Sequence, residues 1–186
     1  RGGRGQGKRL AKYYPRSFNM GVRRELFLRI GGFGDLRHGQ DIAFSHRIIE
    51  SGAKVAYMPE AVVHHRRRGS LAQFLRQTFN WGLARVNLYC IDPAMLEPVH
   101  VAPAAGFWSA ALLTCLALLF RPVRAIWVGL VITTSAVLVA CGIHATSRWR
   151  NGRVGLLVPL VIICQVVGYG LGFTYGFLSR VVLRQR

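Results

Sequence analysis

The residue of this sequence best suited to proton transfer is Asp41, which follows a glycine-rich stretch and opens an apolar run with helical spacing. A carboxylate held at the start of a helix can take the proton of a hydroxyl group, which is the work of a general base. The same position suits an N-terminal cap, because a carboxylate there accepts hydrogen bonds from backbone N–H groups. The residue type alone leaves both roles open.

Two further pairs of residues are candidates for ligand contacts. His64 and His65 follow a predicted strand, and imidazole is a common ligand of first-row divalent metals. A hydrated pair on the surface is the alternative for them. Gly31 and Gly32 have no Cβ atom, so they allow the backbone to come close to a bound ligand, or they form an ordinary turn.

Short helices and strands are expected to position these side chains. Glycine and proline punctuate the chain between apolar runs, and the runs alternate between helical and strand periodicity. We predict strands near 17–22, 54–58 and 61–65, helices at 23–30, 41–51 and 70–89, and a tight turn at 31–34. Alternating helices and strands predict the α/β fold class.

The charge pattern divides the chain near residues 98–103. All seven acidic residues precede residue 100, and only arginines carry charge beyond it. The uncharged segments 101–120, 125–143 and 154–179 are each about as long as the roughly 20 residues that a helix needs to cross a bilayer. We therefore expect a flexible basic segment at 1–14, a water-soluble part at 15–97, and about three transmembrane helices within 98–186. A bend or re-entry of the third segment is the alternative to a third crossing.

The soluble part also carries an ordered set of motifs. They are Phe18-Asn19-Met20-Gly21-Val22-Arg23-Arg24, Ile30-Gly31-Gly32-Phe33, Gly39-Gln40-Asp41, Arg47, Gly52, Tyr57, Pro59-Glu60-Ala61, His65, and Arg76-Gln77 through Gly82. In this order and spacing the set resembles the C-terminal half of family 2 glycosyltransferases. The bacterial exopolysaccharide enzymes of the succinoglycan type, which carry membrane helices after the catalytic domain, are the most similar in character.

The resemblance implies the GT-A fold of nucleotide-diphospho-sugar transferases and inverting transfer of a sugar to a lipid-linked or saccharide acceptor. It implies that Asp41 is the general base and that Gly31, Gly32 and Gln40 lie at the substrate. The sequence departs from the family at Gln40, where an acidic residue is usual. Gln40 keeps hydrogen bonding but has no charge, so the base is tuned differently or the acceptor differs.

A second motif, Gln77-Thr78-Phe79-Asn80-Trp81, resembles the Gln-x-x-Arg-Trp motif of processive polysaccharide synthases. The resemblance implies that Gln77, Asn80 and Trp81 contact the acceptor, with Arg76 beside them. Asn80 stands where the family has Arg, which favours transfer of a single sugar. The alternative for this segment is a plain interfacial helix. Arginines at 66–68, 76 and 85 form a basic belt for a polyprenyl-phosphate acceptor or for anionic lipid headgroups.

The resemblance also implies a divalent metal, Mg or Mn, near His65 or His64. The family's Asp-x-Asp metal motif is not in this sequence, and the chain does not begin with Met. We therefore expect a fragment that is inactive alone, with the metal bound mainly by a missing N-terminal half. The Arg-rich soluble part favours a multi-pass protein of the cell inner membrane with the catalytic part in the cytoplasm.

Two other functions are compatible with the net charge of +18. One is a non-enzymatic basic membrane protein that binds anionic lipids. The other is a nucleic-acid binder, because residues 1–5 contain one Arg-Gly-Gly repeat. A single short repeat with no stacking aromatic module behind it does not support the second function, so we expect no nucleic-acid partner.

Overall fold

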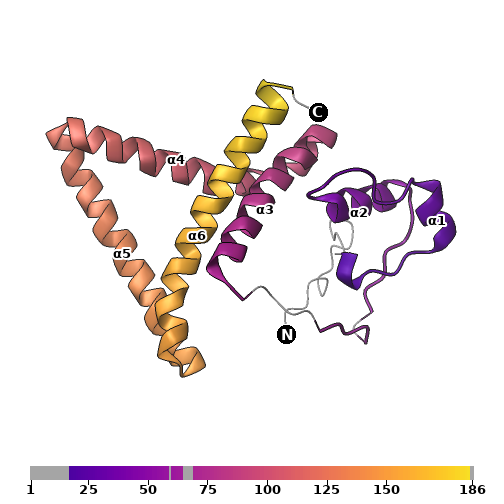
Figure 1. Ribbon diagram of the computed structural model, residues 1–186, viewed down its shortest axis with the longest axis horizontal. Helices are drawn as coiled ribbons and strands as arrows, with labels where there is room; N and C mark the ends of the chain where they lie inside the picture. The colour runs from indigo at the N-terminus through magenta and orange to yellow at the C-terminus, as the bar shows by residue number, and fades with distance from the viewer. Residues whose placement is uncertain (1–16, 59, 65–68, 185–186) are drawn as a thin grey trace.

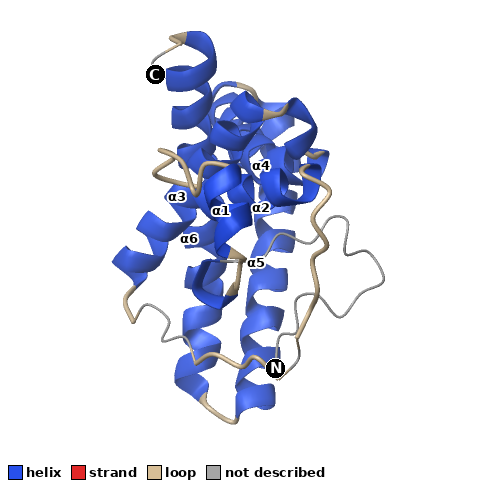
Figure 2. Ribbon diagram, turned by 90° about the vertical axis from the view of Figure 1, so that its right-hand side faces the viewer, coloured by secondary structure: helices blue, strands red, loops and turns tan. Residues whose placement is uncertain are grey.

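The computed structural model describes residues 17–58, 60–64 and 69–184, which form helices joined by loops (Figures 1 and 2). The first half of the chain contains a 3₁₀ turn η2 (Ser17–Asn19) and the helices α1 (Arg24–Arg29), α2 (Gln40–Glu50) and α3 (Leu71–Ile91). The turn η3 (Pro93–Met95) leads to α4 (Pro98–Leu119), α5 (Arg121–Trp149), α6 (Gly152–Gly176) and its π-helical continuation η4 (Phe177–Val182). The predicted flexible segment 1–14 lies outside the described residues.

The predicted α/β fold class and the GT-A fold are wrong, because the described residues contain no strand and no sheet. Residues 17–22 begin with η2, and residues 54–58 and 61–64 are loops. His65, the end of the third predicted strand, lies outside the described residues. A strand is stable only when a neighbour accepts and donates its backbone hydrogen bonds. These segments have the side-chain alternation of a strand, but no other segment within the described residues forms a backbone ladder with them.

The predicted soluble helices are confirmed to within two residues. Helix α2 begins after Gly39, which has a left-handed φ of 88°, and ends before Gly52, with a φ of 74°. Helix α3 is capped at its start by Ser70, whose side-chain oxygen accepts a hydrogen bond from the backbone N–H of Gln73 at 3.3 Å. Such caps satisfy N–H groups that a helix leaves unpaired at its start.

Apolar packing fixes α2 on the C-terminal half of α3. Ile42 and Ala43 of α2 are buried against Leu88 of α3 and Met95 of η3. Burial of a side chain as large as isoleucine, leucine or methionine stabilises the folded state by about 1.5–3 kcal/mol. Helix α2 is therefore attached to α3 by a small hydrophobic core.

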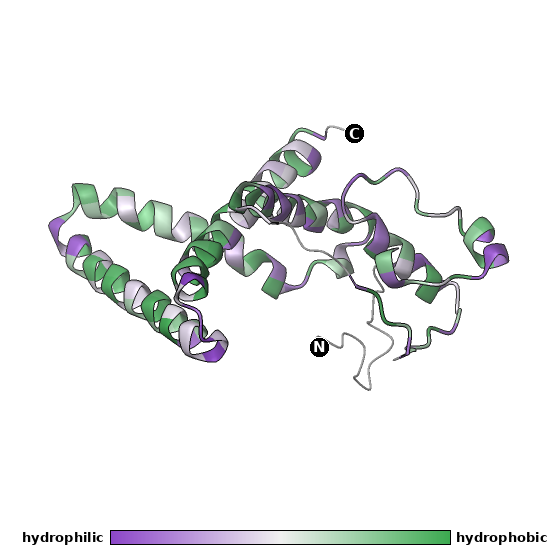
Figure 3. Cartoon of the chain, turned by 60° about the horizontal axis from the view of Figure 1, so that its bottom comes forward, coloured by the Kyte–Doolittle hydropathy of each residue, from purple (hydrophilic) through white to green (hydrophobic). Residues whose placement is uncertain are grey.

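Three helices are long and apolar enough to cross a membrane: Pro98–Leu119, Arg121–Trp149 and the continuous stretch Gly152–Val182. The second and third contain the predicted segments 125–143 and 154–179, and the first covers the predicted segment 101–120 except for its last residue, Phe120. Most of their surface is not covered by protein, and hydrophobic residues run along them while hydrophilic ones gather at the corners (Figure 3). The chain thus has the character of a multi-pass membrane protein. The three helices outline a triangle in Figure 1, in which α4 contacts α6 near Gly170 and Thr174 and α6 continues beyond that contact.

Helix α3 lies along α6, and both run in the same direction. Later residues of α3 contact later residues of α6, from Thr78 at Gly168 to Leu83 at Gly176. A Cβ atom added at Gly172 would overlap the backbone of Phe79, and one at Gly176 would lie 3.0 Å from the side chain of Leu83. Thr78 Oγ1 also donates a hydrogen bond to the backbone oxygen of Cys164 at 3.3 Å. Close backbone approach through small residues is how membrane helices commonly pack.

Candidate functional site

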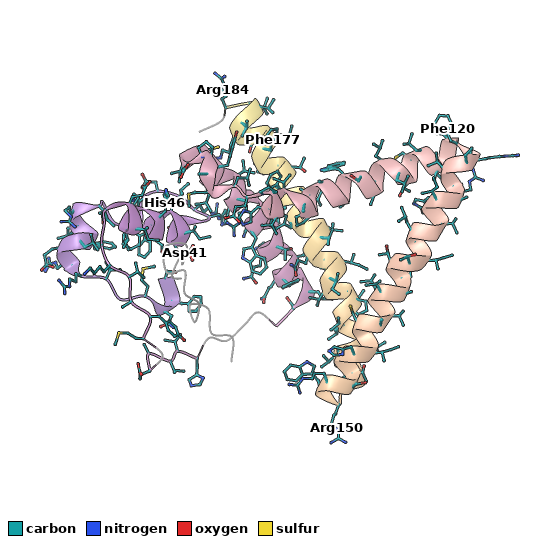
Figure 4. The ribbon with its side chains drawn as sticks, turned by 180° about the vertical axis from the view of Figure 1, so that it is seen from behind. Asp41, His46, Phe120, Arg150, Phe177 and Arg184 are labelled. Carbon is teal, nitrogen blue, oxygen red and sulfur yellow. The ribbon has the colours of Figure 1, made fainter. Side chains whose placement is uncertain are left out.

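Asp41 is the second residue of α2 and is half-buried. Its Oδ1 accepts a hydrogen bond from the backbone N–H of Ile42 at 3.0 Å, and its backbone oxygen accepts one from Ser45 Oγ at 2.8 Å. Asp41 is the acidic residue of the first turn, whereas the N-cap residue, Gly39, has no side chain. The positive end of the helix dipole lies at this turn. Figure 4 shows its side chain on α2.

The turn that contains Gly31 and Gly32 packs against the side of α2. Both glycines have left-handed φ angles, 75° and 62°, and an Arg47 guanidinium nitrogen donates a hydrogen bond to the backbone oxygen of Gly32. A Cβ at Gly32 would lie 2.9 Å from the ring of Phe27, so packing accounts for that glycine. Gly31 is exposed and has open space around it. Arg47 is six residues after Asp41, or about 9 Å along the helix.

The start of α2 is held on α3 by polar and apolar contacts. Asn87 Nδ2 donates a hydrogen bond to the backbone oxygen of His38 at 3.3 Å. A Cβ at Gly39 would lie 3.4 Å from both the side chain of Ala84 and that of Leu88. Gln40, the first residue of α2, is exposed. These contacts hold the start of α2, which carries the candidate base Asp41, against α3.

The predicted acceptor-contacting residues lie on the N-terminal half of α3. Arg76 and Trp81 are exposed, whereas Gln77 and Asn80 are half-buried. The Trp81 ring packs edge-to-face on a neighbouring aromatic ring, with centroids 6.4 Å apart, which restrains its orientation. These four residues precede, along α3, the residues that contact the start of α2, which are Ala84, Asn87 and Leu88. Helix α3 therefore carries one part of the candidate site and holds the other part, the start of α2, against its C-terminal half.

The predicted metal-binding histidines are not joined by other ligands in the part of the chain that the structure describes. His64 is exposed in a loop, and His65 lies outside the described residues. The residues described do contain a group with metal-ligand chemistry, His46, Glu50 and Asp92, but His64 does not belong to it. A metal role for His64 and His65 therefore stays a prediction, and we derive no step through a metal.

The group around His46 joins two elements. His46 Nε2 lies 3.2 Å from Glu50 Oε1 and 3.3 Å from Asp92 Oδ2, and Asp92 Oδ1 accepts a hydrogen bond from the backbone N–H of Ala94. These contacts connect α2 with the junction of α3 and η3. Sequence reasoning missed this group. The spacing of His46 and Glu50 was visible, but the approach of Asp92 depends on the packing of α2 against α3.

His38, three residues before Asp41, has a perturbed pKa. Partial burial is the main cause and the nearby positive charge of Arg37 the second, and both lower the pKa of His38 below 6.5. Both causes disfavour the charged imidazolium. The imidazole next to the start of α2 is thus neutral at neutral pH.

The basic belt is only partly described. Arg76 is exposed and Arg85 half-buried, both on α3, while residues 66–68 lie outside the described residues.

No family model, curated protein or solved structure matches this chain. A functional assignment therefore depends on the arrangement of these side chains and on the motifs in the sequence.

Proposed function

We propose that this chain is the acceptor-side and membrane-anchoring part of an inverting glycosyltransferase that uses a nucleotide-sugar donor. The observation that carries the proposal is the setting of Asp41. Its carboxylate lies in the first turn of α2, and α2 is held on α3, which packs along a membrane-spanning helix. A base in this setting is suited to an acceptor that reaches the enzyme from the membrane.

In the proposed reaction Asp41 accepts the proton of the acceptor hydroxyl while that oxygen attacks the anomeric carbon of the donor sugar. The bond from that carbon to the nucleoside diphosphate breaks on the opposite face, and the configuration inverts. Trp81 offers a ring for stacking on the acceptor sugar, and Gln77 and Asn80 offer amide groups for its hydroxyls. The donor site and the divalent metal, Mg or Mn, belong in this proposal to a part outside the 186 residues.

The proposed acceptor is lipid-linked, with a polyprenyl phosphate, or a saccharide, and the proposed setting is cell-envelope or exopolysaccharide synthesis. The exposed guanidinium of Arg76 supports contact with a phosphate, because guanidinium groups pair well with phosphate oxygens. The Arg-rich soluble part supports a cytoplasmic location at the bacterial inner membrane.

A second candidate is a non-enzymatic basic membrane protein that binds anionic lipids. The net charge of +18 and the three apolar helices favour it. It assigns no role to the carboxylate of Asp41, whereas the transferase requires that carboxylate. The two proposals therefore separate on one substitution.

The test is Asp41→Asn in the full-length protein, assayed for sugar transfer in native membranes. Loss of a general base lowers turnover by about 10²–10⁴-fold, while asparagine keeps the size and much of the hydrogen bonding. Asp35→Asn, in the exposed loop before α2, is the matched control and retains turnover. Gln40→Glu restores the family's acidic pair and is tolerated. Turnover of Asp41→Asn above about a tenth of wild type, well above that range, contradicts the proposal.

A further inference from the structure

An open groove of about 550 Å³ runs between α5 and α6 beside the corner that joins them. Its long wall is one face of α5 from Val137 to Ala145, and Val158 and Ile162 of α6 form the other wall. Arg148 and Trp149 lie at the end of the groove nearest the corner. The groove is thus mostly apolar, with the imidazole of His144 on its α5 wall and Arg148 at one end.

The basic end has the composition of a membrane interface. The Arg148 guanidinium carbon lies 5.9 Å from the centre of the Trp149 ring, and Trp149 is 70% exposed. Tryptophan is enriched where hydrocarbon meets headgroups. Arg150 follows at the tip of the corner, where its side chain points away from the helices (Figure 4), and Arg153 is the second residue of α6. These residues place the corner at the level of the lipid headgroups.

The length of the groove corresponds to one leaflet. From Arg148 to Val137 the helix rises about 16 Å, at roughly 1.5 Å per residue. Half of a hydrocarbon core of about 30 Å is about 15 Å. A chain that enters at the headgroup level and follows the groove therefore ends near the middle of the bilayer. That is the reach of one acyl chain.

The charge of the corner calls for an anionic partner. The sequence has no acidic residue after Glu97, so α5, α6 and their corner supply no carboxylate to Arg148, Arg150 or Arg153. We propose that the groove binds an anionic phospholipid, with an acyl chain along α5 and α6 and the phosphodiester at Arg148. Arg150 and Arg153 stand beside the headgroup. This site does not depend on the proposed transferase activity.

The test uses the full chain, reconstituted in vesicles that contain phosphatidylglycerol and phosphatidylcholine in equal amounts. After extraction into detergent and washing, native mass spectrometry counts the molecules of each lipid that stay bound. The wild type retains phosphatidylglycerol over phosphatidylcholine. Arg148→Gln lowers phosphatidylglycerol retention about fivefold, the effect of losing one basic contact at the surface. Arg121→Gln, at the corner between α4 and α5, is the matched control and leaves retention unchanged.

A second pair of variants tests the groove itself. Ala140→Trp fills the groove without changing charge and lowers retention, whereas Ala125→Trp, exposed near the start of α5, does not. Millimolar inorganic phosphate does not displace the lipid, because the acyl chain contributes to binding. Equal retention of the two lipids, equal effects of the two arginine variants, equal effects of the two tryptophan variants, or displacement by phosphate each overturn the proposal.

Discussion

At the scale of single residues, the start of α2 combines the carboxylate of Asp41 with the imidazole of His38, whose pKa is lowered by partial burial and by the charge of Arg37. Asp41 lies at the positive end of a helix dipole. His38 is half-buried beside Arg37, and its backbone oxygen is held by Asn87. A neutral His38 adds no positive charge to this end of α2.

The lowered pKa of His38 predicts a loss of stability in acid. The unfolded chain, whose histidine has a pKa of about 6.5, takes up a proton before the folded chain does. The contribution of His38 to the free energy of unfolding is therefore fully present above about pH 6.5, and it is lost as the pH falls through the lower pKa of the folded state. Denaturation in mixed micelles between about pH 8 and pH 5 measures this slope.

The comparison variant is His38→Gln, which removes the titrating group and flattens the slope. An identical acid slope in the wild type and His38→Gln contradicts the assignment.

At the scale of elements, the contact between α3 and α6 positions the whole candidate site. Gly168 and Gly172 face Thr78 and Phe79 at distances that leave no room for a Cβ atom. The same helix α3 carries Gln77 to Trp81 and, on its C-terminal half, the core that holds α2. A shift of α3 on α6 would move both parts of the site together.

Gly172→Ala therefore destabilises the protein by about 1–3 kcal/mol, the usual cost of overpacking a tight contact. The obstacle is the backbone of Phe79, which cannot move aside as a flexible side chain can. Gly129→Ala in α5 meets no atom within 4 Å and is neutral or slightly stabilising, because alanine favours helix. Equal unfolding midpoints for the two variants in mixed micelles would show that the helices are not in this contact.

The elements also show which features the sequence can predict. Helices 23–30, 41–51 and 70–89 depend on local signals such as Gly39, Ser70 and Gly52, and the structure has them to within two residues. The turn at 31–34 follows from its glycines. The strands at 17–22, 54–58 and 61–65 required partners that no local pattern specifies, and for the described residues that prediction was wrong.

The candidate site divides in the same way. The position of Asp41 at the start of α2 was predictable, because a glycine and an apolar period mark that helix. The attachment of His38 and Gly39 to α3 was not, because it joins residues far apart in the sequence. The group of His46, Glu50 and Asp92 was missed for the same reason.

At the scale of the whole molecule, charge and hydropathy separate along the chain. Acidic residues end at Glu97, and three long apolar helices follow with arginines at their ends and corners. Most of the surface of these helices is free of protein contact, which in water would expose a large apolar area. A bilayer is the environment that such an apolar area favours, in keeping with the character of a multi-pass membrane protein.

The most direct test of this account is extraction of the chain from membranes with alkaline carbonate and with about 1 M salt. At that ionic strength the Debye length is about 3 Å, so attraction between surface arginines and lipid phosphates is screened. Helices that span the hydrocarbon core are not released by screening. The account predicts that the chain stays in the membrane fraction under both treatments while a peripheral basic protein on the same vesicles is released. Release of the chain into the soluble fraction would contradict the membrane-spanning assignment.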